Sequence, residues 1–259
     1  MPRLAANLST MFTELPFLER FGAAAACGFR AVEFLFPYAE SLEAVAEAKR
    51  AAGVGVALFN LPAGDFAAEE RGMAALAGRD EDFQQSLETA LPYARALDAR
   101  RLHVMAGIAP SGSRRHYIGN LRKAADFFQP YGIGLTIEPI NRRDMPGYHL
   151  SYQADAISVL DEVGRQNLRL QMDFYHCQIM EGDLLRRLEA NLSYISHIQI
   201  AGVPDRCEPD SGEVSYERLL PKLDSLGYAG WVGCEYRPRA RTADGLAWAA
   251  PYGIQAPAA

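Results

Sequence analysis

Short apolar runs alternate with longer amphipathic stretches from one end of the chain to the other. Eight of the short runs are expected to be strands: Arg3–Leu8, Ala31–Phe36, Val54–Leu61, Arg101–Ala106, Gly134–Ile140, Leu168–Phe174, His197–Ala201 and Trp231–Tyr236. Helical spacing of apolar residues marks the stretches between them, namely Phe17–Cys27, Leu42–Ala52, Asp82–Leu97, Leu121–Tyr131, Ala154–Val163 and Tyr216–Leu226. Parallel strands need crossovers that are usually helices, so this alternation predicts a parallel sheet.

Glycines support the predicted helix ends. Five helical stretches are followed directly by a glycine, the residue that most readily adopts the left-handed conformation that ends a helix; they are Gly28, Gly53, Gly132, Gly164 and Gly227. The spacing of the strands is regular except between the third and the fourth, where a long loop is expected at Pro62–Arg79. A loop of this length in a compact domain is usually functional or mobile.

The number of strand–helix units favours a closed barrel over an open doubly wound sheet. An open nucleotide-binding sheet would normally have a glycine-rich fingerprint after an early strand, and the turn after the first strand, residues 7–11, has none. The sequence contains no linker or shift in composition that would divide it. The prediction is therefore α/β, a single (β/α)₈ TIM barrel that covers residues 1–259.

Composition and charge limit the kinds of partner and the cellular location that are expected for this chain. The formal net charge of −6 gives no general attraction to nucleic acid. The four cysteines are scattered, which favours reduced thiols over a disulfide framework or a zinc ribbon. No apolar run is long enough for a membrane span, and the first residues lack the layout of a secretory signal. A cytoplasmic protein that binds neither nucleic acid nor membrane is expected.

Polar residues late in four predicted strands carry the functional signal. They are Glu138, Asp173, Gln199 and Glu235. Side chains alternate faces along a strand, and in residues 168–173 the polar positions share one face while the apolar positions share the other. The apolar face packs under helices, which turns the polar face into the barrel. Late positions in barrel strands lie at the carboxyl-end mouth, where barrel enzymes have their active sites.

Each of these residues taken alone could be half of a buried ion pair. Three carboxylates that face one point repel one another, however, unless a cation lies among them. Glu138, Asp173, Gln199 and Glu235 would offer only oxygen ligands, which suit Mg²⁺, or alternatively Mn²⁺, better than Zn²⁺.

Other polar residues near the predicted mouth are candidates for substrate binding. His176 lies three residues after Asp173 and could be a metal ligand or contact a substrate hydroxyl. Arg206, in the loop after the seventh strand, could bind an anionic group, and Arg71 and Arg79 in the third loop compete for the same role. His103 and His149 are less informative, because isolated histidines of this kind are more often structural.

Several segments resemble the hydroxypyruvate isomerase family, within the xylose isomerase-like barrels. The matching segments cover residues 5–9, 31–38, 60–65, 137–141 (Ile-Glu-Pro-Ile-Asn), 146–150, 173–176 (Asp-Phe-Tyr-His) and 233–238 (Gly-Cys-Glu-Tyr-Arg-Pro). Residues 103–107 and 199–206 look closer to the sister group of 2-oxo-tetronate isomerases. Hydroxypyruvate is the favoured substrate and a 2-oxo-tetronate is the alternative, because residues 138–150, which resemble the first group, are expected to form part of the site.

The resemblance implies residue roles and a reaction. Glu138 and Glu235 would be the catalytic pair, and they would hold the metal together with Asp173 and Gln199. The reaction would convert hydroxypyruvate to tartronate semialdehyde through an enediolate, with His176, Arg206 and Arg71 binding the small hydroxy-keto acid. Related sugar epimerases usually have histidine where this chain has Gln199, so zinc is disfavoured.

Three other functions are weaker alternatives. An AP endonuclease on the same barrel would need more than the five histidines present. A ketose 3-epimerase would need no arginine for a carboxylate. A non-catalytic sugar-acid-binding barrel would not need to retain both glutamates. A homo-oligomer is possible, although no segment identifies an interface.

Overall fold

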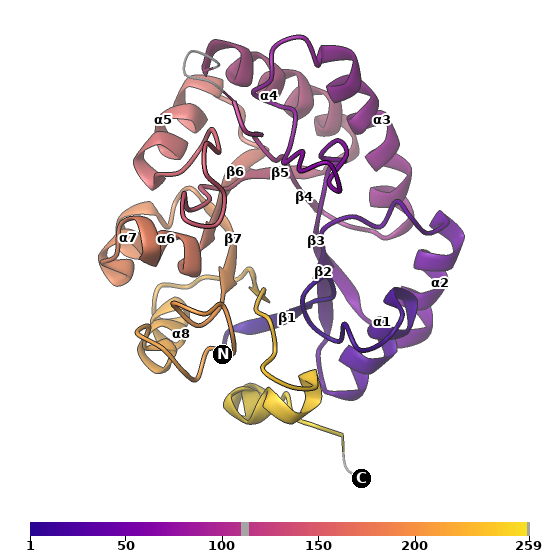
Figure 1. The fold of residues 1–259 in the computed structure, drawn as a ribbon, viewed down its shortest axis with the longest axis vertical. Coiled ribbons are helices and arrows are strands. Elements are labelled where there is room, and N and C mark those ends of the chain that lie inside the picture. The colour runs from indigo at the N-terminus through magenta and orange to yellow at the C-terminus, as the bar shows by residue number, and fades with distance from the viewer. Residues whose placement is uncertain (110–113, 258–259) are drawn as a thin grey trace.

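Eight parallel strands form a closed barrel in the order β1 to β8, and β8 pairs with β1 (Figure 1). The computed structural model describes residues 1–109 and 114–257. Its strands are β1 (Arg3–Asn7), β2 (Ala31–Phe34), β3 (Gly55–Asn60), β4 (Arg101–His103), β5 (Gly134–Ile137), β6 (Leu168–Asp173), β7 (Ile195–Ile200) and β8 (Trp231–Cys234). The predicted fold class is confirmed.

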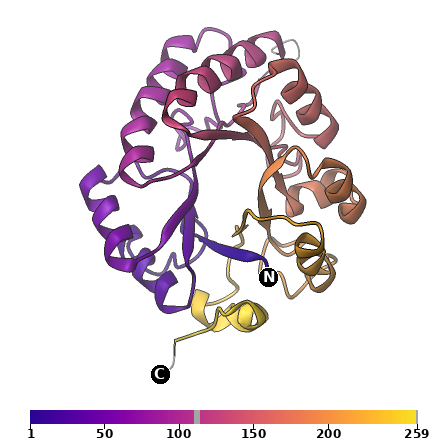
Figure 2. The same cartoon turned by 180° about the vertical axis from the view of Figure 1, so that it is seen from behind.

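Helices surround the barrel, as Figure 2 shows from behind. They are α1 (Phe17–Ala26), α2 (Leu42–Ala52), α3 (Asp80–Ala96), α4 (Arg114–Phe128), η1 (Gln129–Tyr131), α5 (Gln153–Val163), α6 (Phe174–Met180), α7 (Leu184–Asn191), α8 (Tyr216–Ser225) and η2 (Thr242–Tyr252). The last of these, η2, is a 3₁₀ segment that leads the chain back to α1, where the Gln255 amide donates to the Cys27 carbonyl at 3.0 Å.

The strands begin and end at slightly different residues from those predicted. All eight of them end one to three residues earlier than predicted, and one physical cause is the loss of a backbone donor. β5 illustrates the cause: Glu138 is followed by Pro139, which has no N–H to donate. β7 begins at Ile195, two residues before the predicted start, and a register shift against β6 lies at Leu170/Gln171.

The short helices α6 and α7 were not among the predicted elements. α6 starts immediately after β6, and the Asp173 carboxylate accepts the Tyr175 amide at 2.7 Å as its N-cap. With no loop between strand and helix, the two apolar patterns run together in the sequence. The helix places His176 one turn above the end of the strand.

The predicted glycine ends are confirmed, since all five glycines have positive φ. Gly28 shows the constraint most clearly. Its φ is 94°, and a Cβ at this position would lie 2.4 Å from the carbonyl oxygen of Gly253. Only glycine allows α1 to end against the C-terminal segment.

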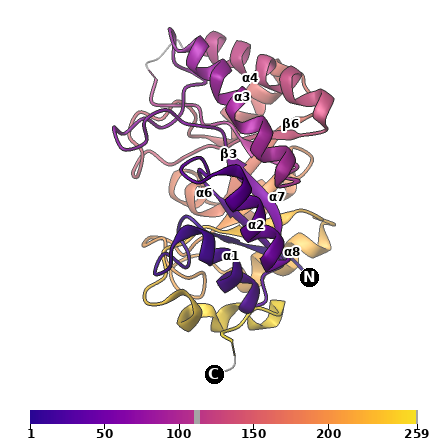
Figure 3. The same ribbon diagram turned by 90° about the vertical axis from the view of Figure 1, so that its right-hand side faces the viewer.

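The side chains that fill the interior of the barrel change from apolar at the amino end to polar toward the carboxyl end. At the amino end Ala5, Ala31 and Ala57 pack with the partly buried Trp231. Farther along the strands the inward positions become polar and remain buried, and they include Glu33, His103, Thr136, Gln171 and His197. The carboxyl-end loops project on the side away from the N-terminus in Figure 3. Among the described helices, none is both long and apolar enough to cross a membrane.

Candidate active site

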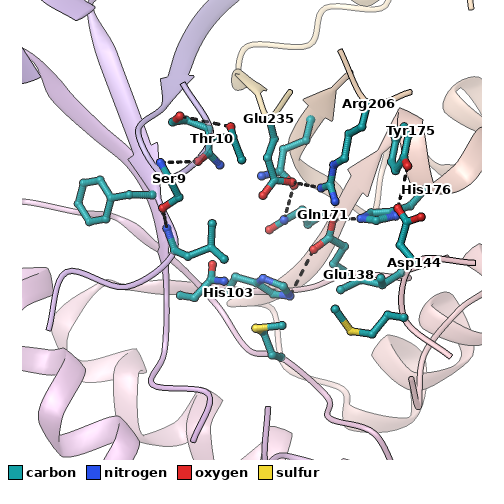
Figure 4. A pocket seen from close by; sticks show the side chains of 18 of the residues that line it. Ser9, Thr10, His103, Glu138, Asp144, Gln171, Tyr175, His176, Arg206 and Glu235 are labelled. Carbon is teal, nitrogen blue, oxygen red and sulfur yellow. Dashed lines mark hydrogen bonds and ion pairs between the residues drawn. The ribbon is translucent and has the colours of Figure 1, made fainter. Parts of the chain in front are cut away.

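A cavity of about 540 Å³ opens at the carboxyl end of the barrel. It brings together six of the predicted site residues, which are Arg71 in the loop after β3, Glu138 after β5, His176 on α6, Gln199 on β7, Arg206 after β7 and Glu235 after β8. Figure 4 shows Glu138, His176, Arg206 and Glu235 pointing toward one another across this space. Asp173 lies beside it at the end of β6, in register with Gln199.

Glu138 and Asp173 are two deeply buried acidic residues of the site. Glu138 is 5% exposed and Asp173 is 1% exposed. No donor in the described residues reaches Oε1 of Glu138 or Oδ2 of Asp173. Burial first, and then the charges of Asp173 and Glu235, hold the pKa of Glu138 well above its ordinary range. Burial likewise raises the pKa of Asp173 to about 6, against the opposing effect of Arg206.

Arg206 is the cation that faces these carboxylates. Its Nη2 lies 2.7 Å from Oε2 of Glu235 and 3.8 Å from Oδ2 of Asp173, and its guanidinium stacks over the Tyr175 ring at 4.9 Å. Burial would lower the pKa of Arg206, but Glu235 and Asp173 outweigh it and raise the pKa. Burial raises the pKa of Glu235 to about 7 despite this arginine. The backbone φ of 54° at Arg206 fits a loop shaped to aim one side chain inward.

His176 is held as a hydrogen-bond donor toward the acids. The Asn141 Oδ1 accepts the Asp144 amide at 2.7 Å, which leaves the Asn141 Nδ2 to donate to Nδ1 of His176 at 2.7 Å. Burial lowers the pKa of His176 well below its ordinary value, so the ring is neutral and carries its proton on Nε2. That nitrogen lies 3.6 Å from Asp173 Oδ2 and 4.0 Å from Glu138 Oε1. This arrangement favours a contact with substrate over metal ligation by His176.

His103 belongs to the cavity, although isolated histidines in the sequence gave no functional signal. Its Nε2 lies 3.7 Å from Oε2 of Glu138 and has no hydrogen-bond partner among the described residues. Burial, with a smaller effect from His197, lowers its pKa to about 3. His103 is therefore a neutral ring at the base of the site. The even spacing from Arg101 to His103 along β4 could have indicated that it faces inward.

Glu33 is a second residue missing from the predicted site. It lies in the middle of β2 with no exposed surface, and its carboxylate accepts a hydrogen bond from Gln199 at 2.8 Å. The signal that could have found it is a glutamate inside the otherwise apolar run Ala31–Phe34. Its negative charge contributes to the raised pKa values of Glu138, Asp173 and Glu235, after the larger effect of burial.

The two candidate arginines of the third loop differ in whether their side chains reach the cavity. Arg71 lines the cavity, where its guanidinium stacks over the Phe66 ring at 4.0 Å. Arg79 instead pairs with Glu70 and Asp82 within its own segment of the chain. The structure thus keeps Arg71 as a candidate for substrate contact.

The donor set of this cavity fits a divalent metal ion. One ligand atom each from Glu138 and Asp173 lies within 4.8 Å of the other, and within the same distance of a ring nitrogen of His176, which the hydrogen bond from Asn141 leaves as a donor to a bound group. Glu138 and Asp173 each also have one buried carboxylate oxygen without a donor among the described residues, and buried charges of one sign are stable only when an opposite charge compensates them. Gln199 and Glu235 add oxygen atoms to the same cavity.

Comparison with known proteins agrees with the fold. A family model described as the xylose isomerase-like TIM barrel matches residues 21–252. The chain belongs to the xylose isomerase-like TIM barrel family.

Individual members of this family are similar over nearly the full length. A 2-oxo-tetronate isomerase of Cupriavidus necator is 52% identical over 97% of this chain and 99% of its own length. A hydroxypyruvate isomerase of Escherichia coli is 44% identical over 97% of this chain and 100% of its own length. A crystal structure described as an AP endonuclease of family 2 from Brucella melitensis is 51% identical, with a TM-score of 0.96 over 97% of this chain and 99% of that one.

Proposed function

We propose that this protein is an aldose–ketose type isomerase that interconverts hydroxypyruvate and tartronate semialdehyde. The observation that carries the proposal is the placement of two buried glutamates with raised pKa values, Glu138 and Glu235, in one cavity with an arginine. The hydroxypyruvate isomerase of Escherichia coli, a relative at 44% identity, supports this substrate.

Glu138 and Glu235 suit the transfer of a proton between two neighbouring carbons. A general acid–base group works best when its pKa is near the operating pH, and burial brings the pKa of Glu235 to about 7. One glutamate would take the proton from the hydroxyl-bearing carbon, and the other would deliver a proton to the former carbonyl carbon. Neutral His176 and His103 add buried nitrogens that can hydrogen-bond to substrate oxygens while the proton moves.

Arg206 and Arg71 are proposed to bind the substrate carboxylate. Arg206 is buried beside Glu235 and carries a full positive charge, and a charge-assisted hydrogen bond from a guanidinium suits a carboxylate. Arg71 lies at the rim of the same cavity. An anionic substrate would thus replace part of the pairing that Glu235 now provides to Arg206.

Glu138, Asp173, Gln199 and Glu235 are proposed to hold the metal, with Mg²⁺ as the ion and Mn²⁺ as its substitute. The oxygen-only character of the set favours these hard cations. When bound, the ion would supply Lewis-acid stabilisation of the negative charge that develops on the substrate oxygens.

The four cysteines are free thiols, which supports a reducing, cytoplasmic setting.

A 2-oxo-tetronate is the second candidate substrate. It is favoured by the 52% identity to the 2-oxo-tetronate isomerase of Cupriavidus necator, above the 44% to the hydroxypyruvate isomerase. The chemistry is the same in both cases, because a 2-oxo-tetronate differs from hydroxypyruvate by a hydroxymethyl group in place of one hydrogen on the hydroxyl-bearing carbon. The same acid–base residues would serve either substrate.

An activity panel tests the proposal. The purified protein would be given hydroxypyruvate, a 2-oxo-tetronate or a neutral ketohexose, with and without EDTA. We expect turnover of an acid that EDTA abolishes and added Mg²⁺ restores. Higher kcat/KM for the 2-oxo-tetronate would select the second candidate, whereas turnover of the ketohexose alone would contradict both.

A further inference from the structure

Glu33 on β2 occupies space that Gly233 on β8, two strands away, leaves open for it. Its side chain crosses the barrel interior and reaches Gly233 on β8, where a Cβ would lie 2.3 Å from both carboxylate oxygens. Any other residue at position 233 would collide with this carboxylate. Burial removes the hydration of a carboxylate, so the groups that surround Glu33 must supply hydrogen bonds in its place.

Three side chains donate hydrogen bonds to the Glu33 carboxylate. Asn7 Nδ2 at 3.0 Å and Gln199 Nε2 at 2.8 Å share Oε1, and His197 Nε2 lies 2.6 Å from Oε2. An ionised carboxylate only accepts hydrogen bonds. The carboxamide of Gln199 must therefore present its NH₂ group to Glu33.

This orientation determines where the oxygen of Gln199 points. The Oε1 atom faces the other way and accepts a hydrogen bond from Gln171 Nε2 at 2.6 Å, and the Oε1 of Gln171 in turn accepts one from Thr136 at 2.9 Å. Figure 4 shows Gln171 among Glu138, Arg206 and Glu235. A carbonyl oxygen has two lone pairs, so Gln199 Oε1 keeps one free for a second partner.

We propose that Glu33 is a positioning residue that fixes the Gln199 carboxamide with its oxygen turned toward the acidic site, as a ligand for the divalent cation. The inference rests on the proposed role of Gln199 in metal binding. A glutamine at position 33 would fill the same space, but it could donate as well as accept, and Gln199 could then turn its NH₂ group toward the site. The acceptor-only character of Glu33, and not its size, selects the useful orientation.

The test is the affinity of the metal-free, full-length protein for Mn²⁺, measured by isothermal titration calorimetry. Loss of a group that orients a metal ligand typically weakens binding by about 10–100-fold, and we expect this loss for Glu33→Gln. Glu33→Asp keeps the charge but withdraws it from Gln199, so it should weaken binding to a similar extent. Asn7→Ala is the matched control, because it removes another donor to the same oxygen and leaves the Gln199 orientation intact.

A double-mutant cycle separates orientation from charge. In a Gln199→Ala background the amide is gone, so adding Glu33→Gln should change the Mn²⁺ affinity by no more than about twofold, a non-additive result expected of coupled residues. An equal loss in both backgrounds, or wild-type affinity in both Glu33 variants, would overturn the positioning role alone. Absence of Mn²⁺ binding by the wild-type protein would overturn the proposed metal site together with it.

Discussion

The two ends of the barrel interior differ in whether their polar side chains have hydrogen-bond partners within the described part of the chain. At the amino end, small apolar side chains pack together, and each of three arginines has a hydrogen-bond acceptor: Arg3 and Arg169 donate to the carbonyls of Ala229 and Ser193, and Arg101 donates to the Ser196 hydroxyl at 3.1 Å. At the carboxyl end, Glu138 and Asp173 retain buried oxygens without a donor in the described part of the chain.

We interpret this difference as a division of roles: the amino-end residues stabilise the barrel, and the carboxyl-end residues serve the proposed reaction. Buried polar groups are normally hydrogen-bonded, and the exceptions call for an explanation. At the carboxyl end the proposed function supplies one, because a cation and an anionic substrate would provide the missing partners. Raised pKa values are a further consequence of gathering like charges away from water.

The largest effect is expected from the glutamates of the carboxyl end. Glu138→Gln and Glu235→Gln should each lower kcat by about 10²–10⁴-fold, the range of a lost acid–base group, or more where metal binding is also impaired. Thermal unfolding and circular dichroism should stay close to those of the wild-type protein. Glu189→Gln, on the surface beside Lys222, is the control and should keep full activity. A near-normal rate in either site variant would refute its catalytic role.

Replacement of Arg206 should affect KM for an acidic substrate more than KM for a neutral one. A hydrogen bond to a charged group contributes about 1.5–3 kcal/mol, so Arg206→Ala should raise KM for the acid by roughly ten- to a hundredfold. Any activity on a neutral ketohexose should change much less. Arg79→Ala is the matched control, because that guanidinium is already paired with Glu70 and Asp82. Equal changes in KM for the acid and the neutral sugar would refute carboxylate binding by Arg206.

The affinity for Mn²⁺ should depend on pH at the carboxyl end. The cation needs ionised carboxylates, and burial places the pKa of Asp173 at about 6 and that of Glu235 at about 7 in the metal-free protein. Lowering the pH through these values adds protons that compete with the cation. Affinity should therefore fall as pH falls from about 7 to below about 6, and binding should release protons. Calorimetry over a pH series checks this, and a constant affinity would contradict it.

The smallest effect is expected at the amino end. Arg101→Met removes the bond to Ser196 and should lower the free energy of unfolding by about 1 kcal/mol, the usual net contribution of one hydrogen bond. It should leave kcat and KM unchanged, as determined by denaturant unfolding and steady-state assays. A loss of activity without a loss of stability would contradict the division between the two ends.

Periodicity carries more information about the fold than about the site. The alternation of strands and helices predicts the barrel because each βα unit follows local rules, and the glycine ends are also local. The inward direction of Asp173 and Gln199 follows from parity along their strands. α6 was not predicted because it begins at Phe174, directly after the last residue of β6, with no loop between them.

The residues that sequence reasoning missed act through partners distant in the chain. Glu33 becomes a recognisable part of the site only when β7 and β8 bring Gln199 and Gly233 against it, more than 160 residues away. His103 acquires its role only from the proximity of Glu138. The tautomer of His176 depends on Asn141, which is held in turn by Asp144. Such contacts follow from closure of the barrel, so the local signals at Glu33 and His103 do not show which residues they contact.

The most direct test of the central claim is proton exchange followed by ¹H NMR in D₂O, with hydroxypyruvate, Mg²⁺ and the wild-type protein. Our account predicts that the protons on the hydroxyl-bearing carbon exchange for deuterium as tartronate semialdehyde appears. It also predicts that EDTA or Glu138→Gln stops both processes. Exchange that continues undiminished with EDTA and in Glu138→Gln, or no exchange with hydroxypyruvate or a 2-oxo-tetronate, would contradict the claim that the carboxyl-end glutamates and a cation perform the isomerisation.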